Sequence, residues 1–132
     1  RMAAATSYND RITFTGALPR EQLGAAYGTM SVFTFPSLKD TQAWVLHEAA
    51  HAGLPIVLID RKLSEVFEDG KNGYFAKNTP RDMADKIISL LRSPKKRTEF
   101  GAHGKKLAGK FTEHGQVKKL VKLYEEIIEN RE

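Results

Sequence analysis

The chain has 132 residues, of which 41% are hydrophobic and 28% are charged, and it contains no cysteine. This length and composition predict one globular domain with a hydrophobic core, and they exclude disordered, collagen-like and coiled-coil chains. The lack of cysteine excludes disulfide bonds and thiolate metal sites and fits the reducing cytoplasm, where we expect the protein. No apolar run approaches the roughly 18 residues of a membrane span. Because the first residue is arginine rather than methionine, we expect the chain to be part of a longer protein.

The net charge of +5 is concentrated in the C-terminal third of the chain. Residues 1–93 carry 11 basic and 10 acidic side chains, whereas residues 94–124 carry nine basic and two acidic ones. Such a stretch is most often a set of solvated helix faces, and it also suits the phosphates of an anionic lipid surface. Aromatic residues are not interleaved with these basic residues, so we expect no nucleic-acid partner.

Strand and helix patterns alternate through the first half of the chain. Short runs rich in β-branched and aromatic residues predict strands at residues 11–15, 31–35 and 55–59. Pro19 opens a predicted helix at residues 19–28, in which Leu23 and Tyr27 share one face, and the segment at 43–52, which has no helix breaker, predicts another. The third strand is almost continuously apolar, which is typical of a parallel strand that is covered on both faces.

The second half of the chain is predicted to be mainly helical. Before it come three short predicted elements, a helix near 63–68, a turn at 69–73 and a strand at 74–76. Thr79-Pro80 and Ser93-Pro94 each place a hydroxyl cap before a proline in the first helical position, which predicts two helix starts. A final helix carries an apolar stripe between residues 117 and 128, which we expect to pack in the core or against another domain.

This order of elements predicts an α/β fold, in which a Rossmann-like parallel sheet is flanked by helices and followed by extra C-terminal helices. We expect a single domain over residues 1–132, made of a linker at 1–10, a βα core at 11–78 and C-terminal helices at 79–132. Ligands of such sheets bind beyond the carboxyl ends of the strands. The loop at 36–42 is the best candidate, because it leads directly into a helix.

The start of that helix combines anion-binding amides with two carboxylates. Backbone amides from Gln42 to Val45 are free to bind an anion at a helix N-terminus. Asp40 precedes the helix and Glu48 lies in its second turn, so both can face one ligand if the loop folds back. Amides suit a phosphate, and carboxylates accept hydrogen bonds from hydroxyl groups. The pattern therefore favours a phosphate joined to a sugar.

Residues 36–55 read PSLKDTQAWVLHEAAHAGLP, and this run resembles the donor-binding segment of retaining GT-B glycosyltransferases, the group that includes glycogen synthases and sucrose synthases. The family signature is a Pro-Ser turn, an acid, seven residues, a Glu-Ala pair and a Gly-x-Pro strand entry. Its counterparts here are Pro36-Ser37, Asp40, Glu48-Ala49 and Gly53-Leu54-Pro55. The flanking runs ITFTG and SEVFEDGKNGYF extend the resemblance over residues 11–128.

The resemblance implies most of the C-terminal half of a GT-B fold. It implies retaining transfer of a hexose from a nucleoside diphosphate sugar, with a UDP-sugar favoured, to a saccharide or lipid acceptor, without a cofactor or a required metal. An N-terminal domain binds the acceptor in such enzymes, so we expect this chain to be inactive alone. The Thr41-Gln42 pair resembles glycolipid-forming members, which together with the basic stretch at 94–124 suggests peripheral contact with the cytoplasmic face of an anionic membrane.

The same resemblance implies roles for single residues. Asp40 and Glu48 are the predicted catalytic residues, the first contacting hydroxyls of the transferred sugar and the second the ribose of the nucleotide. The amides around 42–44 hold the diphosphate, and the Gly16 loop lies near the base. The predicted substrate-binding residues are thus Gly16, Ser37, Thr41, Gln42, Ala43 and Trp44. The family usually has Glu in place of Asp40 and Gly in place of Ala43, so this chain has a shorter acid and a less permissive backbone there.

A zinc metalloprotease is the alternative hypothesis. His47-Glu48-Ala49-Ala50-His51 matches the H-E-x-x-H motif, in which two histidines on one helix face bind zinc and the glutamate activates a water molecule. Glu65 or Glu68 could be the third ligand. However, Gly53 and Pro55 end the helix soon after His51, and the apolar strand that follows favours a Rossmann-like unit over a protease.

Overall fold

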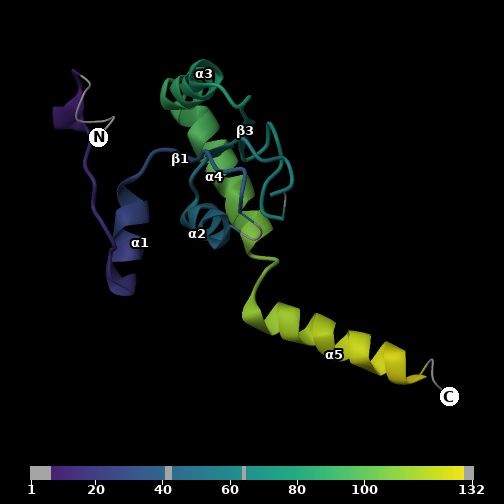
Figure 1. The fold of residues 1–132 in the computed structure, drawn as a ribbon. Coiled ribbons are helices and arrows are strands. Elements are labelled where there is room, and N and C mark those ends of the chain that lie inside the picture. Colours follow the sequence, from purple (N-terminus) through teal and green to yellow (C-terminus); the bar gives the residue numbers. More distant parts are fainter. Residues whose placement is uncertain (1–6, 41–42, 64, 130–132) are drawn as a thin grey trace.

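The structure, a computed structural model, describes residues 7–40, 43–63 and 65–129. Three parallel strands form one sheet in the order β1 (Phe33–Phe35), β2 (Ile56–Leu58) and β3 (Gly73–Phe75). The helical elements are η2 (Asn9–Arg11), α1 (Arg20–Thr29), α2 (Trp44–Ala52), α3 (Pro80–Leu91), α4 (Pro94–Ala108) and α5 (Glu113–Glu129). Helices α2, α3 and α4 pack around the sheet, α1 lies beside α2, and α5 extends away from this body (Figure 1). The predicted parallel α/β architecture is confirmed.

The central strand β2 is covered on both faces, as its continuous apolar run predicts. All three of its residues are 0% exposed. Ile56 and Leu58 belong to a hydrophobic cluster shared with α2, whereas Val57 packs in a second cluster with Leu90 of α3 and Phe100 of α4. Successive side chains of a strand point to opposite faces of the sheet. Strand β2 therefore joins the two halves of the core.

Helices α2 and α4 approach each other so closely that their backbones touch. Helix α2 ends at Gly53, which has the left-handed conformation with φ 77°. Gly101 of α4 lies directly against this residue, and a Cβ atom at position 101 would overlap the carbonyl oxygen of Gly53. One turn further on, a Cβ at Gly104 would lie 3.7 Å from the Cα of Ala50. The end of α2 is thus fixed by a contact that leaves no room for a side chain.

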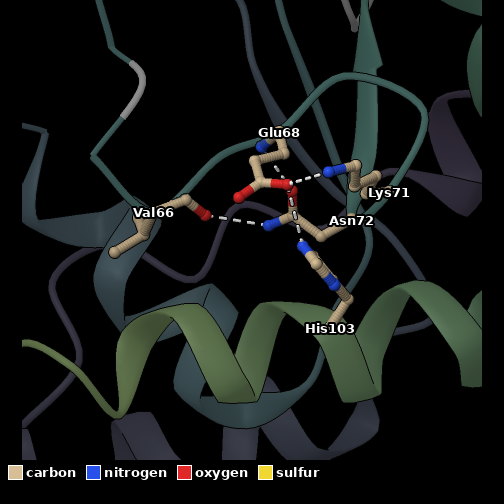
Figure 2. Close-up of polar contacts among 5 residues, drawn as sticks. All are labelled: Val66, Glu68, Lys71, Asn72 and His103. Carbon is tan, nitrogen blue, oxygen red and sulfur yellow. Dashed lines mark hydrogen bonds and ion pairs between the residues drawn. The ribbon is translucent and has the colours of Figure 1, made fainter.

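A polar network holds α4 to the loop that leads into β3 (Figure 2). Asn72 is fully buried, donates from Nδ2 to the carbonyl oxygen of Val66 at 2.8 Å and accepts the amide hydrogen of Glu68 at 2.7 Å. Glu68 Oε2 lies 2.8 Å from Lys71 Nζ and 3.2 Å from His103 Nε2 of α4. The hydrogen bond from Lys71, followed by that from His103, lowers the pKa of Glu68 below its ordinary value, although desolvation opposes them.

The strand predicted at residues 11–15 is not formed. Residues 12–16 run as an irregular segment, and the side chain of Phe14 is 81% exposed. Within the described ranges β1 pairs only with β2, so this segment has no strand beside it. The preference of β-branched and aromatic residues for strands reflects packing on a sheet, and without that packing the segment stays irregular.

The prediction of a short helix near residues 63–68 is also wrong. The described residues there form turns, and Ser64 lies outside them. Asp60 Oδ1 accepts the amide hydrogen of Lys62 at 2.9 Å, and the Asn72 side chain takes that of Glu68. Side-chain acceptors of this kind compete with helical hydrogen bonds and stabilise turns instead.

The C-terminal helices begin where their capping signals predict. The Thr79 hydroxyl accepts the amide hydrogen of Asp82, and the Ser93 hydroxyl accepts that of Lys96, each at 3.3 Å. The apolar stripe of α5 does not join the core of this chain, since Tyr124, a member of the stripe, is 58% exposed. Among the helices that the structure describes, none is long and apolar enough to cross a membrane.

We expect Gly101→Ala to destabilise the fold by about 1–3 kcal/mol, because the new methyl group must displace the backbone of Gly53. Gly24→Ala in α1 is the matched control, since a Cβ there meets no atom within 4 Å. Alanine is a better helix former than glycine by about 1 kcal/mol, so the control should be neutral or stabilising. Urea unfolding of both variants tests this, and equal effects would contradict the backbone contact.

We expect Glu68→Gln to lower the free energy of unfolding at neutral pH but not in acid. The folded protein holds the pKa of Glu68 below its ordinary value of 4.5, so the carboxylate stabilises the fold above that pH. This stabilisation is lost as the pH falls through the folded pKa. Unfolding measured from neutral to acid pH should show the variant converging on the wild type, whereas a gap that persists once the pH is below the folded pKa would disprove the linkage. Glu99→Gln in α4 controls for net charge.

Candidate functional site

The candidate site lies where the loop after β1 leads into α2. Asp40 Oδ1 accepts the amide hydrogen of Ala43, the residue before the helix, at 2.7 Å. A carboxylate in this place is stabilised by the partial positive charge of the helix N-terminus. Asp40 therefore helps to form the helix start on which the site is built. Thr41 and Gln42, two of the predicted substrate-binding residues, lie outside the described residues.

The first residues of α2 differ sharply in burial. Ala43 is 4% exposed, and its methyl group belongs to the hydrophobic cluster beneath α2. Trp44 begins the helix with 65% of its surface exposed, and its ring centre lies 5.3 Å from that of His47. The amides of Trp44 and Val45 occupy the first helical turn, where a helix has no carbonyl group to accept them. An exposed indole thus stands next to amides suited to an anion.

Glu48 lies on the exposed side of α2 and is held by a residue of α1. The Tyr27 hydroxyl donates to Glu48 Oε2 at 2.8 Å. The pKa of Tyr27 is raised to about 12, first by burial and then by the hydrogen bond and negative charge of Glu48. The phenol is therefore protonated at neutral pH and acts as a donor to the carboxylate.

A cleft of about 640 Å³ lies between α1 and α2. It is lined by Leu18, Arg20, Leu23, Trp44, His47, Glu48, His51 and Phe111. The aromatic rings and leucines supply apolar walls, while Glu48 and Arg20 supply one charge of each sign. Such a mixture of apolar surface and a few polar groups is typical of small-molecule sites.

The structure brings together only some of the predicted site residues. Trp44 and Glu48 line the cleft, and Ala43 lines a neighbouring cavity of about 60 Å³. Gly16, Ser37 and Asp40 do not line either space. Gly16 has a φ of 65° and lies two residues before the lining residue Leu18, and the Ser37 hydroxyl accepts the amide hydrogen of Lys39 at 3.4 Å.

The H-E-x-x-H residues line the same cleft but are not arranged as a zinc site. His47 is buried, with Nε2 3.2 Å from Glu65 Oε2 and its ring edge-on to Phe111. Glu48 is bonded to Tyr27, and His51 is exposed. Within the described ranges, no group of three or more His, Cys, Asp or Glu side chains is arranged to hold a metal ion. The geometry gives the protease hypothesis no support.

Sequence reasoning missed Tyr27 and Phe111, and it considered Glu65 only as a possible zinc ligand. Tyr27 shares a helix face with Leu23, which predicts that its ring packs inward, but helical spacing says nothing about its hydroxyl. Phe111 and Glu65 contact His47 from segments remote in sequence. No local pattern marks either residue, because both contacts depend on how α2 packs in the folded chain.

The parallel sheet and the cleft along α2 define an α/β protein of the class whose ligands bind beyond the carboxyl ends of the strands. A family model described as "Glycosyl transferases group 1" matches residues 1–107, and the chain belongs to this family. It is 34% identical over 103 residues to the spore coat protein SA of Bacillus subtilis, a match that covers 75% of this chain and 27% of that protein. The chain therefore spans about a quarter of its relative's length. Family membership decides against the metalloprotease.

Two solved GT-B glycosyltransferases have the same fold. Sucrose-phosphate synthase from Thermosynechococcus elongatus matches with a TM-score of 0.83 and 22% identity, over 98% of this chain and 34% of that one. The pneumococcal O-GlcNAc transferase GtfA, solved in complex with UDP and GlcNAc, matches with a TM-score of 0.79 and 23% identity, over 96% of this chain and 26% of that one. The resemblance to a GT-B fold is confirmed.

Proposed function

We propose that this chain supplies the donor-binding site of a retaining hexosyltransferase. It would bind a nucleoside diphosphate sugar, with a UDP-sugar favoured, and the hexose would pass to a saccharide or lipid acceptor. The observation that carries the proposal is the cleft between α1 and α2, because it places Trp44 and Glu48 beside the helix start in a chain of a glycosyltransferase family. The complex of the structurally similar GtfA with UDP supports the choice of base.

In this proposal each group at the start of α2 has one task. Glu48 accepts hydrogen bonds from the ribose hydroxyls, and the amides of Trp44 and Val45 bind the diphosphate. Asp40 accepts a hydrogen bond from a hydroxyl of the sugar. Its bond to the Ala43 amide does not prevent this, because a carboxylate can accept several hydrogen bonds. The bond instead orients the carboxylate at the helix start.

The leaving diphosphate is stabilised electrostatically. The N-terminus of α2 carries a partial positive charge, and Arg20 lines the same cleft. Preorganised donors of this kind stabilise the negative charge that develops as the sugar departs. The proposal thus requires no metal ion or cofactor. Because the chain spans about a quarter of its B. subtilis relative, we also propose that a further domain binds the acceptor and that this chain alone has no transferase activity.

We expect Asp40→Ala and Glu48→Ala each to weaken UDP-glucose binding by about tenfold, because each removes a charged hydrogen-bond acceptor. Amide NMR titration in the presence of a chelator measures this and shows whether shifts cluster around Trp44 and Glu48. Asp85→Ala in α3 is the control, since it removes a carboxylate far from the cleft. Unchanged affinity in a folded Glu48→Ala variant would refute the donor site.

We further propose that the basic stretch at 94–124 contacts the cytoplasmic face of an anionic membrane. The side chains of Lys95 and Lys122 are 87% and 76% exposed, so they are available to a charged surface. Each basic residue close to such a membrane contributes about 1 kcal/mol.

We expect the chain to sediment with vesicles that contain phosphatidylserine and not with vesicles of phosphatidylcholine alone. Binding should fall when three lysines of α5 are replaced by glutamine, namely Lys118, Lys119 and Lys122. The control replaces three lysines elsewhere, namely Lys39, Lys62 and Lys77, and has the same net charge. If the two triple variants lose binding equally, the contact is not specific to α5.

A further inference from the structure

Tyr27 and Glu48 make a side-chain hydrogen bond that bridges the two helices bordering the cleft. The tyrosine is in the last turns of α1, the glutamate is 21 residues later in α2, and the oxygen atoms are 2.8 Å apart. The Tyr27 ring is held independently of this bond, because it packs on the hydrophobic cluster and lies 5.9 Å from the ring of Phe33 in β1. The hydroxyl is therefore presented to Glu48 from a fixed place.

The hydrogen bond from Tyr27 restricts the conformation of the Glu48 side chain. Glu48 is exposed, and a free glutamate on a helix surface samples several rotamers. Arg20 and His51 line the same cleft as Glu48. Because Tyr27 is protonated well above neutral pH, it offers Glu48 a permanent neutral donor that leaves the charge of the carboxylate intact. One oxygen, Oε2, is engaged in this way.

We propose that Tyr27 is a positioning residue for the donor site: its hydroxyl fixes the carboxylate of Glu48 so that the glutamate can accept hydrogen bonds from a ribose. This inference rests on the proposed function, since it assigns Glu48 to the nucleotide. Tyr27 itself touches no ligand in this scheme. It borders an adjoining cavity of about 400 Å³, which has Arg20, Leu23, Glu48 and His51 in common with the cleft.

A double-mutant cycle tests whether Tyr27 acts through Glu48. Tyr27→Phe keeps the ring and its packing on Phe33 but removes the donor. We expect it to weaken the binding of UDP by about fivefold to tenfold in the wild-type background. In the Glu48→Ala background the same substitution should have no further effect, because the group that it positions is gone.

Two controls separate this role from a general loss of structure. Tyr74→Phe removes a phenol hydroxyl that accepts from Lys96 at 3.1 Å on the other side of the sheet, and it should leave UDP affinity unchanged. The ¹³C signal of the Glu48 carboxyl group should shift in Tyr27→Phe and stay in place in Tyr74→Phe.

Each outcome of the cycle decides the proposal. Unchanged affinity in Tyr27→Phe overturns the positioning role, as does an equal loss in both backgrounds. If Glu48→Ala weakens UDP binding in either case, the proposed donor site survives that failure. If the wild-type chain binds no UDP, the proposed function fails and the role of Tyr27 fails with it.

Discussion

The burial of β2 on both faces is the constraint on which the rest of the structure depends. A strand without exposed surface must be covered by helices above and below, and here α2 covers one face while α3 and α4 cover the other. The loop after β1 carries the chain to α2, and the loop after β3 carries it to α3. The loop after β1 and the first turn of α2 are consequently held at the carboxyl edge of the sheet, where parallel sheets bind ligands.

The start of α2 combines groups that would oppose one another in isolation. A carboxylate beside the N-terminus of a helix repels an anion bound there, yet Asp40 also accepts the amide hydrogen of Ala43 and so helps to keep the helix start in place. A ligand that presents a phosphate to the amides and a hydroxyl group to Asp40 offsets this repulsion, because the carboxylate then accepts a hydrogen bond from the hydroxyl group. Trp44 adds a large apolar surface next to this polar edge. Under the proposed function, this combination favours a phosphate joined to a sugar over a simple anion.

The sequence predicted those features that depend on local chemistry. The hydroxyl caps at Thr79 and Ser93 each join residues three apart in the sequence. The continuous apolar run of β2 predicts that the strand is buried on both faces. Motif spacing correctly placed Glu48 in the second turn of α2. The segment at 11–15 was misassigned because strand propensity needs a neighbouring strand to take effect. The bond between Tyr27 and Glu48 could not be predicted, since it joins two helices whose relative placement is set only by the folded core.

The two helices that border the cleft, α1 and α2, differ in how they are anchored to the rest of the fold. Helix α2 is anchored by the sheet beneath it and by the contact between the Gly53 and Gly101 backbones, where no side chain can adjust. Helix α1 has no fully buried residue, and among the described side chains its hydrogen-bonded link to α2 is the Tyr27 hydroxyl. Among the described residues of α1, Tyr27 both packs on the hydrophobic cluster and bonds to α2. This one side chain therefore ties the outer wall of the cleft to the sheet and to the carboxylate that is proposed to bind the nucleotide.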